Sequence, residues 1–182
     1  MSLKYVEDKI DAIRERSNAT RARAQAQRAA IMSDSRLSSE GKAEAIEALR
    51  EPTNATISAL RLEEDKLIND KIVELERTVV GTVGSDPAAV INYRDAQDRA
   101  ERLTSAVEAD LLMTRALRSD DKTLAAAVAR VSMERNFKGV ADAFAAENPS
   151  LIEATRDLSA LEGFRSDVGR SFERAMIYST EF

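Results

Sequence analysis

Five arginines lie within residues 14–28, in the stretch RERSNATRARAQAQR, which holds a single acidic residue. They are Arg14, Arg16, Arg21, Arg23 and Arg28. A guanidinium group forms paired hydrogen bonds with phosphates and with carboxylates alike, so two interpretations are open. The stretch contacts nucleic acid, or it pairs with acidic side chains on another helix.

Other chemistry is sparse. The chain contains no histidine and no cysteine, which removes imidazole bases, thiolate nucleophiles and thiolate metal ligands. Acidic clusters occur at 63–65 (EED) and 119–121 (SDD), but neither has the spacing of a calcium-binding loop. We expect solvated helix surfaces and helix caps there. The sequence predicts no catalytic, metal or cofactor-binding residues and no small-molecule substrate, so we expect a protein that is not an enzyme, with carboxylate-based catalysis as a minor alternative.

Composition points to an all-α fold. Apolar residues make up 43% of the 182 residues, yet only 4% are aromatic, and the chain has six glycines and three prolines. A core of small aliphatic residues with few turns is typical of long packed helices. No apolar run approaches the ~18 residues of a membrane span, and residues 1–16 lack a hydrophobic signal segment. We therefore expect no membrane contact.

The arginines flank a heptad pattern. Its seam, from Val6 to Ile31, is apolar at both ends and polar in the middle. With Ile10 at position a, the arginines fall at positions e and g, on both sides of the seam. Because those positions pair with acids on a partner helix, the register favours helix pairing over nucleic acid. The seam positions are Val6, Ile10, Ile13, Ser17, Thr20, Ala24, Gln27 and Ile31.

A second helix, acidic in character, follows a turn at 32–42. Residues 39–80 carry ten acids against six bases, which predicts an antiparallel, coiled-coil-like hairpin over 1–80. We expect a kink or a short break near Pro52, because proline lacks the backbone donor that a helix needs. GTVGSDP at 81–87 reads as a linker, with Asp86 and Pro87 starting the next helix.

A small C-terminal helical bundle is expected over 88–176. One helix should carry Val90 to Leu117 as a continuous stripe, and three shorter helices should follow, the last of them ending near Gly163. Residues 164–176 again show helical spacing. The final residues, 177–182, are expected to form an extended tail. Its apolar Ile177, Tyr178 and Phe182 either fold back on the domain or insert into a partner.

Two stretches carry a family resemblance. SDSRLSSEGKAEAIEAL, at 33–49, resembles a helix-turn-helix phrase found in helical proteins encoded among tailed-phage structural genes. Residues 93–162, beginning YRDAQDRAERL, are similar to small head-region proteins of phages that infect actinobacteria. The resemblance implies an accessory virion or head-assembly protein and transfers no functional residues.

The function expected from the sequence is therefore structural and non-enzymatic. We expect a multi-copy or homo-oligomeric component of a tailed-phage particle, assembled in the host cytoplasm, which contacts capsid, portal or connector proteins through its helices. The five arginines and the apolar tail residues are the candidate interface. Two alternatives stay open: a capsid-assembly scaffolding protein, and a nucleic-acid-binding module that uses the arginines of residues 14–28.

Overall fold

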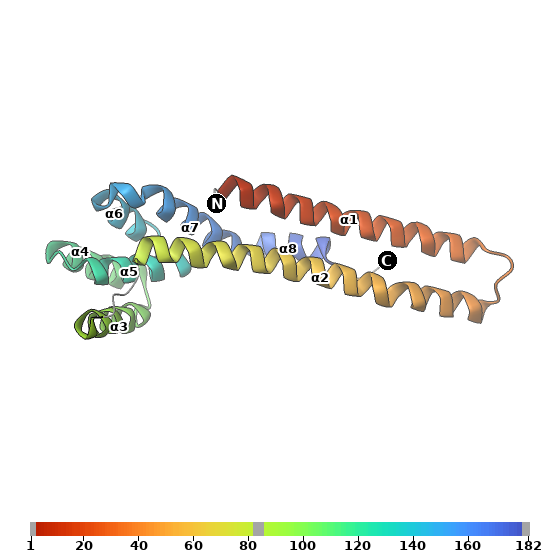
Figure 1. The fold of residues 1–182 in the computed structure, drawn as a ribbon, viewed down its shortest axis with the longest axis horizontal. Helices are drawn as coiled ribbons and strands as arrows, with labels where there is room; N and C mark the ends of the chain where they lie inside the picture. The colour runs from red at the N-terminus through yellow and green to blue at the C-terminus, as the bar shows by residue number, and fades with distance from the viewer. Residues whose placement is uncertain (1–2, 82–85, 180–182) are drawn as a thin grey trace. The chain divides into compact units, whose positions relative to one another are not determined.

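The protein is helical throughout the part that the computed structural model describes, residues 3–81 and 86–179, which contains no strand (Figure 1). This confirms the all-α prediction and the long antiparallel pair of α1 and α2. The elements are α1 (Leu3–Ser33), α2 (Ser39–Val80), α3 (Pro87–Glu101), α4 (Ala106–Arg118), α5 (Lys122–Glu134), α6 (Val140–Glu147), a 3₁₀ turn η1 (Pro149–Leu151), α7 (Ile152–Ser166) and α8 (Val168–Ile177).

The chain divides into two compact units. One comprises residues 1–69 together with 168–182, and the other comprises residues 70–167. This division differs from the expected one at 80 and 88, because α8 returns to the α1–α2 hairpin. The expected linker at 81–87 lies mostly outside the described residues.

The seam between α1 and α2 follows the heptad pattern over its first half. Val6, Ile10, Ile13, Ser17 and Ala24 are buried, whereas Gln27 is exposed. Beyond this point, over 25–52, none of the residues is buried. The far end of the hairpin therefore has no buried core, and its turn is ordered by local hydrogen bonds. There, Ser38 Oγ accepts a hydrogen bond from Gly41 N, and Asp34 accepts one from Arg36 N.

Helix α2 runs through Pro52 without interruption, so a break there is excluded. Pro52 cannot donate to the carbonyl of residue 48, but the neighbouring threonine hydroxyls bond to the backbone: Thr53 Oγ1 donates to Leu49 O at 2.7 Å, and Thr56 Oγ1 donates to Pro52 O at 2.8 Å. Buried seam residues begin directly after Pro52, with Thr53, Ile57 and Leu60, and their packing stabilises the helix there.

Helix α8 lies alongside the hairpin and contacts both α1 and α2 (Figure 1). Just past its end, Tyr178 packs into a buried cluster with Ile13, Ile57 and Leu60, and Ile177 packs against the same cluster. The tail residues Ile177 and Tyr178 are thus the last residue of a helix and the turn after it, and they are not extended. Phe182 lies outside the described residues.

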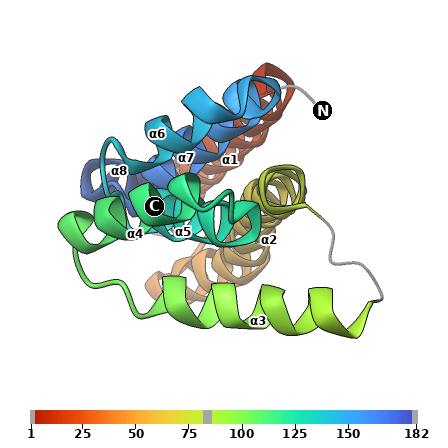
Figure 2. The ribbon, with the colours of Figure 1, turned by 90° about the vertical axis from the view of Figure 1, so that its left-hand side faces the viewer.

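The second unit is built around α5, which contacts α3, α4, α6 and α7 (Figure 2). Residues 124–129 and 131–133 of α5 are all buried, as expected of a helix surrounded by others. The expected single helix over Val90 to Leu117 is wrong. It ends at Glu101, and Ser105 caps the start of α4 by accepting a hydrogen bond from Glu108 N at 3.3 Å.

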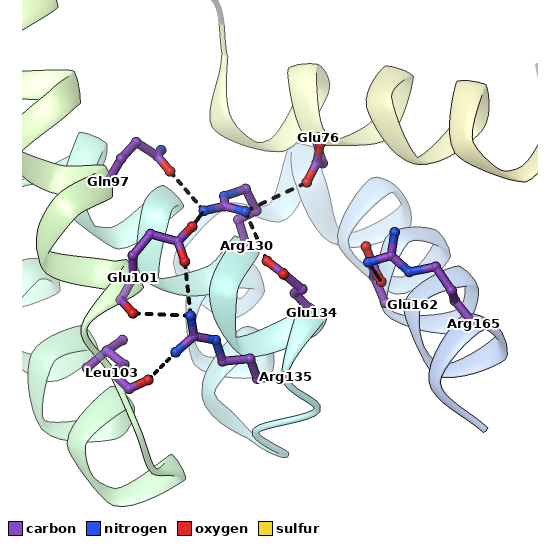
Figure 3. A network of polar contacts seen from close by, with 9 residues as sticks. All are labelled: Glu76, Gln97, Glu101, Leu103, Arg130, Glu134, Arg135, Glu162 and Arg165. Atoms are coloured by element: carbon purple, nitrogen blue, oxygen red, sulfur yellow. Dashed lines mark hydrogen bonds and ion pairs between the residues drawn. The ribbon is translucent and has the colours of Figure 1, made fainter. Parts of the chain in front are cut away.

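Two arginines of the second unit join α3 to α5 (Figure 3). Arg130 contacts Gln97, Glu101, Glu134 and Glu76, while Arg135 bonds to Glu101 and to the carbonyl of Leu103.

Helix α7 extends past its predicted end at Gly163 to Ser166. One glycine inside a helix costs only about 1 kcal/mol relative to alanine, and the buried side chains of Leu158 and Leu161 offset that cost.

Candidate functional site

The most unusual side chain of the first unit is Glu64, which is fully buried among helices α1, α2 and α8. It lies on the apolar seam of α2, between Leu60 and Leu67. A buried carboxylate is costly unless hydrogen bonds and opposite charges compensate for lost water. The surroundings of Glu64 supply both.

Three side chains donate hydrogen bonds to Glu64. Arg14 donates from Nε to Oε2 and from a terminal nitrogen to Oε1, both at 3.2 Å. Arg174 Nε donates to Oε1 at 2.8 Å, and the Tyr178 hydroxyl donates to Oε2. The Nη2 atom of Arg174 donates a further hydrogen bond to Asp65 Oδ1. We call Arg14, Glu64, Asp65, Arg174 and Tyr178 the Glu64 cluster.

The surroundings of the Glu64 cluster favour the protonated forms of Arg14, Arg174 and Tyr178. Burial disfavours the charged form of Arg14, but the hydrogen bond and the charge of Glu64 outweigh it, so the pKa of Arg14 is raised. Burial opposes the charge of Arg174 in the same way, and Asp65 and Glu64 together raise its pKa. Burial, followed by the hydrogen bond to Glu64, raises the pKa of Tyr178, which therefore stays a protonated donor.

The C-terminal end of α8 is held by two further contacts from α1. Ser17 Oγ donates to the Ile177 carbonyl at 2.9 Å, and Arg21 donates to the Met176 carbonyl at 2.8 Å. The last carbonyls of a helix have no partner within the helix and carry partial negative charge. A hydroxyl and a guanidinium therefore suit this position.

These contacts turn the polar side of α8 inward and leave its apolar side in solvent. Val168, Phe172 and Met176, spaced four residues apart, are 83%, 68% and 54% exposed. Ala175 lies on the same side and is exposed too. We call these four residues the α8 stripe. An amphipathic helix normally buries its apolar side, so this orientation marks the stripe as a candidate contact surface.

The predicted arginines fall into two groups. Arg14 and Arg21, at position e, lie on the side that α8 covers. Arg16, at position g, pairs with Glu63 at 3.1 Å on the other side, which confirms that arginines of α1 meet acids of α2. Arg23 and Arg28 are exposed and form no ion pair with any described residue.

The Glu64 carboxylate has no free oxygen for catalysis, because each oxygen accepts two hydrogen bonds from the cluster. Elsewhere among residues 3–81 and 86–179, no group of three or more acidic side chains is placed to hold a metal ion. Nor does any helix in the described ranges have the length and apolar character needed to cross a membrane.

The Glu64 cluster was missed at the sequence level, since EED at 63–65 was expected to be solvated. A signal was present, however. Ile57, Leu60, Glu64 and Leu67 follow the alternating spacing of three and four that marks a buried seam. Thr53 and Lys71 occupy the same seam and are also buried. Polar residues at seam positions identify the places where partner side chains must be supplied.

Comparison with known proteins adds no relative. No protein-family model matches the sequence, and neither the curated proteins nor the solved structures gave a match.

Proposed function

We propose that this protein is a non-enzymatic structural component of a tailed-phage particle, associated with the head or the head–tail connector. It acts through helix-mediated contacts with other protein subunits, among them capsid, portal or connector proteins. The observation that carries the proposal is the α8 stripe, an apolar helix surface held facing solvent by the Glu64 cluster. The resemblance of residues 33–49 and 93–162 to phage proteins is the reason for proposing a phage particle as the assembly.

The far end of the hairpin supports the same view. Apolar Ile31, Ile46 and Leu49 are only half-buried, and none of the residues over 25–52 is buried. Such an arm gains stability when a neighbouring subunit covers it, and contacts that are weak singly add up in a symmetric particle.

The test is mass spectrometry of particles purified from the source that encodes this chain, with counting of copies per particle. Recovery from mature particles in a fixed ratio to the capsid protein is the expected result. Recovery from immature capsids alone identifies a scaffolding protein. Absence from both kinds of particle refutes the proposal.

A nucleic-acid role is the second candidate, because Arg23 and Arg28 are exposed and have no acidic partner among the described residues. Phosphate contacts weaken steeply with salt, so binding of labelled DNA should be measured from 50 to 200 mM salt. Replacing Arg23 and Arg28 with glutamate should abolish that binding if this role is correct. A matched variant, Arg50→Glu on α2, is the control.

A further inference from the structure

The hairpin has a second feature on the side away from α8. Between α1 and α2 lies an open groove of about 330 Å³, lined by Arg16, Ala19, Thr20, Arg23, Thr56, Ala59, Leu60 and Glu63. We call it the hairpin groove. Its floor is made of small side chains and Leu60, and its rim carries two arginines against one glutamate.

The α8 stripe and the hairpin groove flank the same pair of helices on opposite sides. The position-e residues Arg14 and Arg21 contact the Glu64 cluster and α8, whereas the position-g residues Arg16 and Arg23 line the groove. Because α8 is fixed on one side, its stripe cannot reach the groove of its own copy. The groove of another copy is open to it.

We propose that the α8 stripe docks into the hairpin groove of a second copy of this chain. The proposal deepens the proposed function, on which it rests, by naming one partner as the protein itself. Each copy offers a stripe on one side and a groove on the other, so the contact is heterologous. Such contacts build rings or open chains and do not stop at a closed pair.

The dimensions of the two surfaces match. At a rise of about 1.5 Å per residue, the stripe from Val168 to Met176 is about 12 Å long, and the groove from Arg16 to Arg23 is about 10 Å long. An apolar cavity of about 150 Å³ accommodates a benzene molecule, so a groove of about 330 Å³ has room for the Phe172 ring and for a neighbouring side chain.

The charges also match. Beside the stripe, the exposed Glu173 forms a long ion pair with Arg14, at 4.0 Å. The groove rim offers Arg23, which forms no ion pair with a described residue. A groove with an excess of positive charge thus meets a stripe that is bordered by a carboxylate, which sets the direction of docking.

One such contact is weak. Four stripe residues bury far less than the roughly 800 Å² per partner of a stable interface. Self-association is therefore expected at high local concentration, such as within an assembling particle, with several contacts acting together.

The test is sedimentation velocity of the full chain over a wide concentration range, with two variants. Phe172→Glu disables the stripe, and Ala59→Trp fills the groove; both positions are exposed, so the fold should survive. Val107→Glu, at an exposed apolar position on α4, is the control. Circular dichroism melting checks each fold, and Ala19→Trp replaces Ala59→Trp if the latter melts early.

We expect the wild type and the control to show a concentration-dependent rise in mass, and each variant to weaken it at least about tenfold. Mixing the two variants is decisive. The Phe172→Glu chain keeps its groove and the Ala59→Trp chain keeps its stripe, so the mixture should form a one-to-one dimer and nothing larger.

Three results overturn the inference. The wild type stays monomeric throughout; Ala59→Trp associates like the wild type, as it would if stripes paired with stripes; or a labelled oligonucleotide occupies the groove and is lost with Ala59→Trp. If the chain stays monomeric in sedimentation but is recovered from purified particles, this inference is refuted and the proposed function is not. An associating chain that is absent from particles refutes the proposed function alone.

Discussion

Replacing Glu64 with alanine should detach α8 from the hairpin. The change leaves Arg14, Arg174 and the Tyr178 hydroxyl without the acceptor that they share. Removing one partner of a buried ion pair costs about 3–5 kcal/mol. The Arg14 and Arg174 side chains retain 15% and 19% exposure, so water recovers part of that loss. We therefore expect a cost of about 2–4 kcal/mol, and a smaller one, about 1.5–3 kcal/mol, for Glu64→Gln, which keeps one acceptor oxygen.

Two measurements separate loss of α8 from loss of the whole fold. Hydrogen exchange over 168–179 reports opening of α8, and a cost of about 3 kcal/mol corresponds to roughly 100-fold faster exchange. Limited trypsin digestion after Arg170 and Arg174 reports the same event. Urea unfolding followed by circular dichroism gives the global cost.

The matched control is Glu63→Ala, one residue away on the same helix. Glu63 and Arg16 are both half-exposed, and such pairs contribute about 0–1 kcal/mol. The control should leave exchange over 168–179 unchanged. If Glu64→Ala and Glu63→Ala behave alike in exchange and in urea, the Glu64 cluster does not hold α8.

Three further predictions concern pH and helix capping. The pKa of Tyr178 is raised above its usual 10.0, mainly by burial. The stability that Tyr178 contributes is therefore present below pH 10.0 and is lost as the pH rises above it, by up to about 1.4 kcal/mol per pH unit. Urea unfolding at pH 9 and 11 should show that loss for the wild type and none of that component for Tyr178→Phe; equal slopes would contradict the assignment. Burial also raises the pKa of Glu162, so its neutral form favours folding below the unfolded value of 4.5, and that gain is lost as the pH rises. The stability of Glu162→Gln relative to the wild type should therefore increase between about pH 4 and 7. A stability difference that does not grow with pH would refute this. Finally, Ser105→Ala should cost about 1 kcal/mol in urea unfolding because α4 loses its N-cap, whereas Ser58→Ala on the exposed side of α2 should be near neutral; equal costs would show that the cap is unimportant.

The hairpin was predictable because heptad spacing reports directly which residues face a partner helix. Ile10, Ile13 and Ala24 are buried as the seam requires, and Arg16 meets Glu63 across it. The junction of α3 and α4 was missed because the apolar stripe from Val90 to Leu117 continues across it. A Ser-x-x-Glu sequence at 105–108 marked the start of α4, and local capping outweighed periodicity there.

The Glu64 cluster could be predicted only in part. Seam spacing places Glu64 inside the hairpin, but nothing in the local pattern identifies Arg174 and Tyr178, more than 100 residues away, as its partners. Periodicity likewise shows that α8 is amphipathic without showing which side is buried. That choice depends on long-range charge pairing, which a local pattern does not contain.

The orientation of α8 sets two requirements against each other. Turning it over would bury Val168, Phe172 and Met176, each worth about 1.5–3 kcal/mol. The same rotation would remove Arg174 from Glu64 and leave a buried carboxylate short of partners, at about 3–5 kcal/mol. The rotation would also take Tyr178 out of its buried cluster and break the hydrogen bonds from Ser17 and Arg21 to the end of α8. With these losses included, the two sides of the balance are comparable, and neither orientation of a lone copy satisfies both requirements. The proposed docking of the stripe into the hairpin groove of another copy would cover the apolar side while the Glu64 cluster stays intact, so the proposal accounts for the observed orientation.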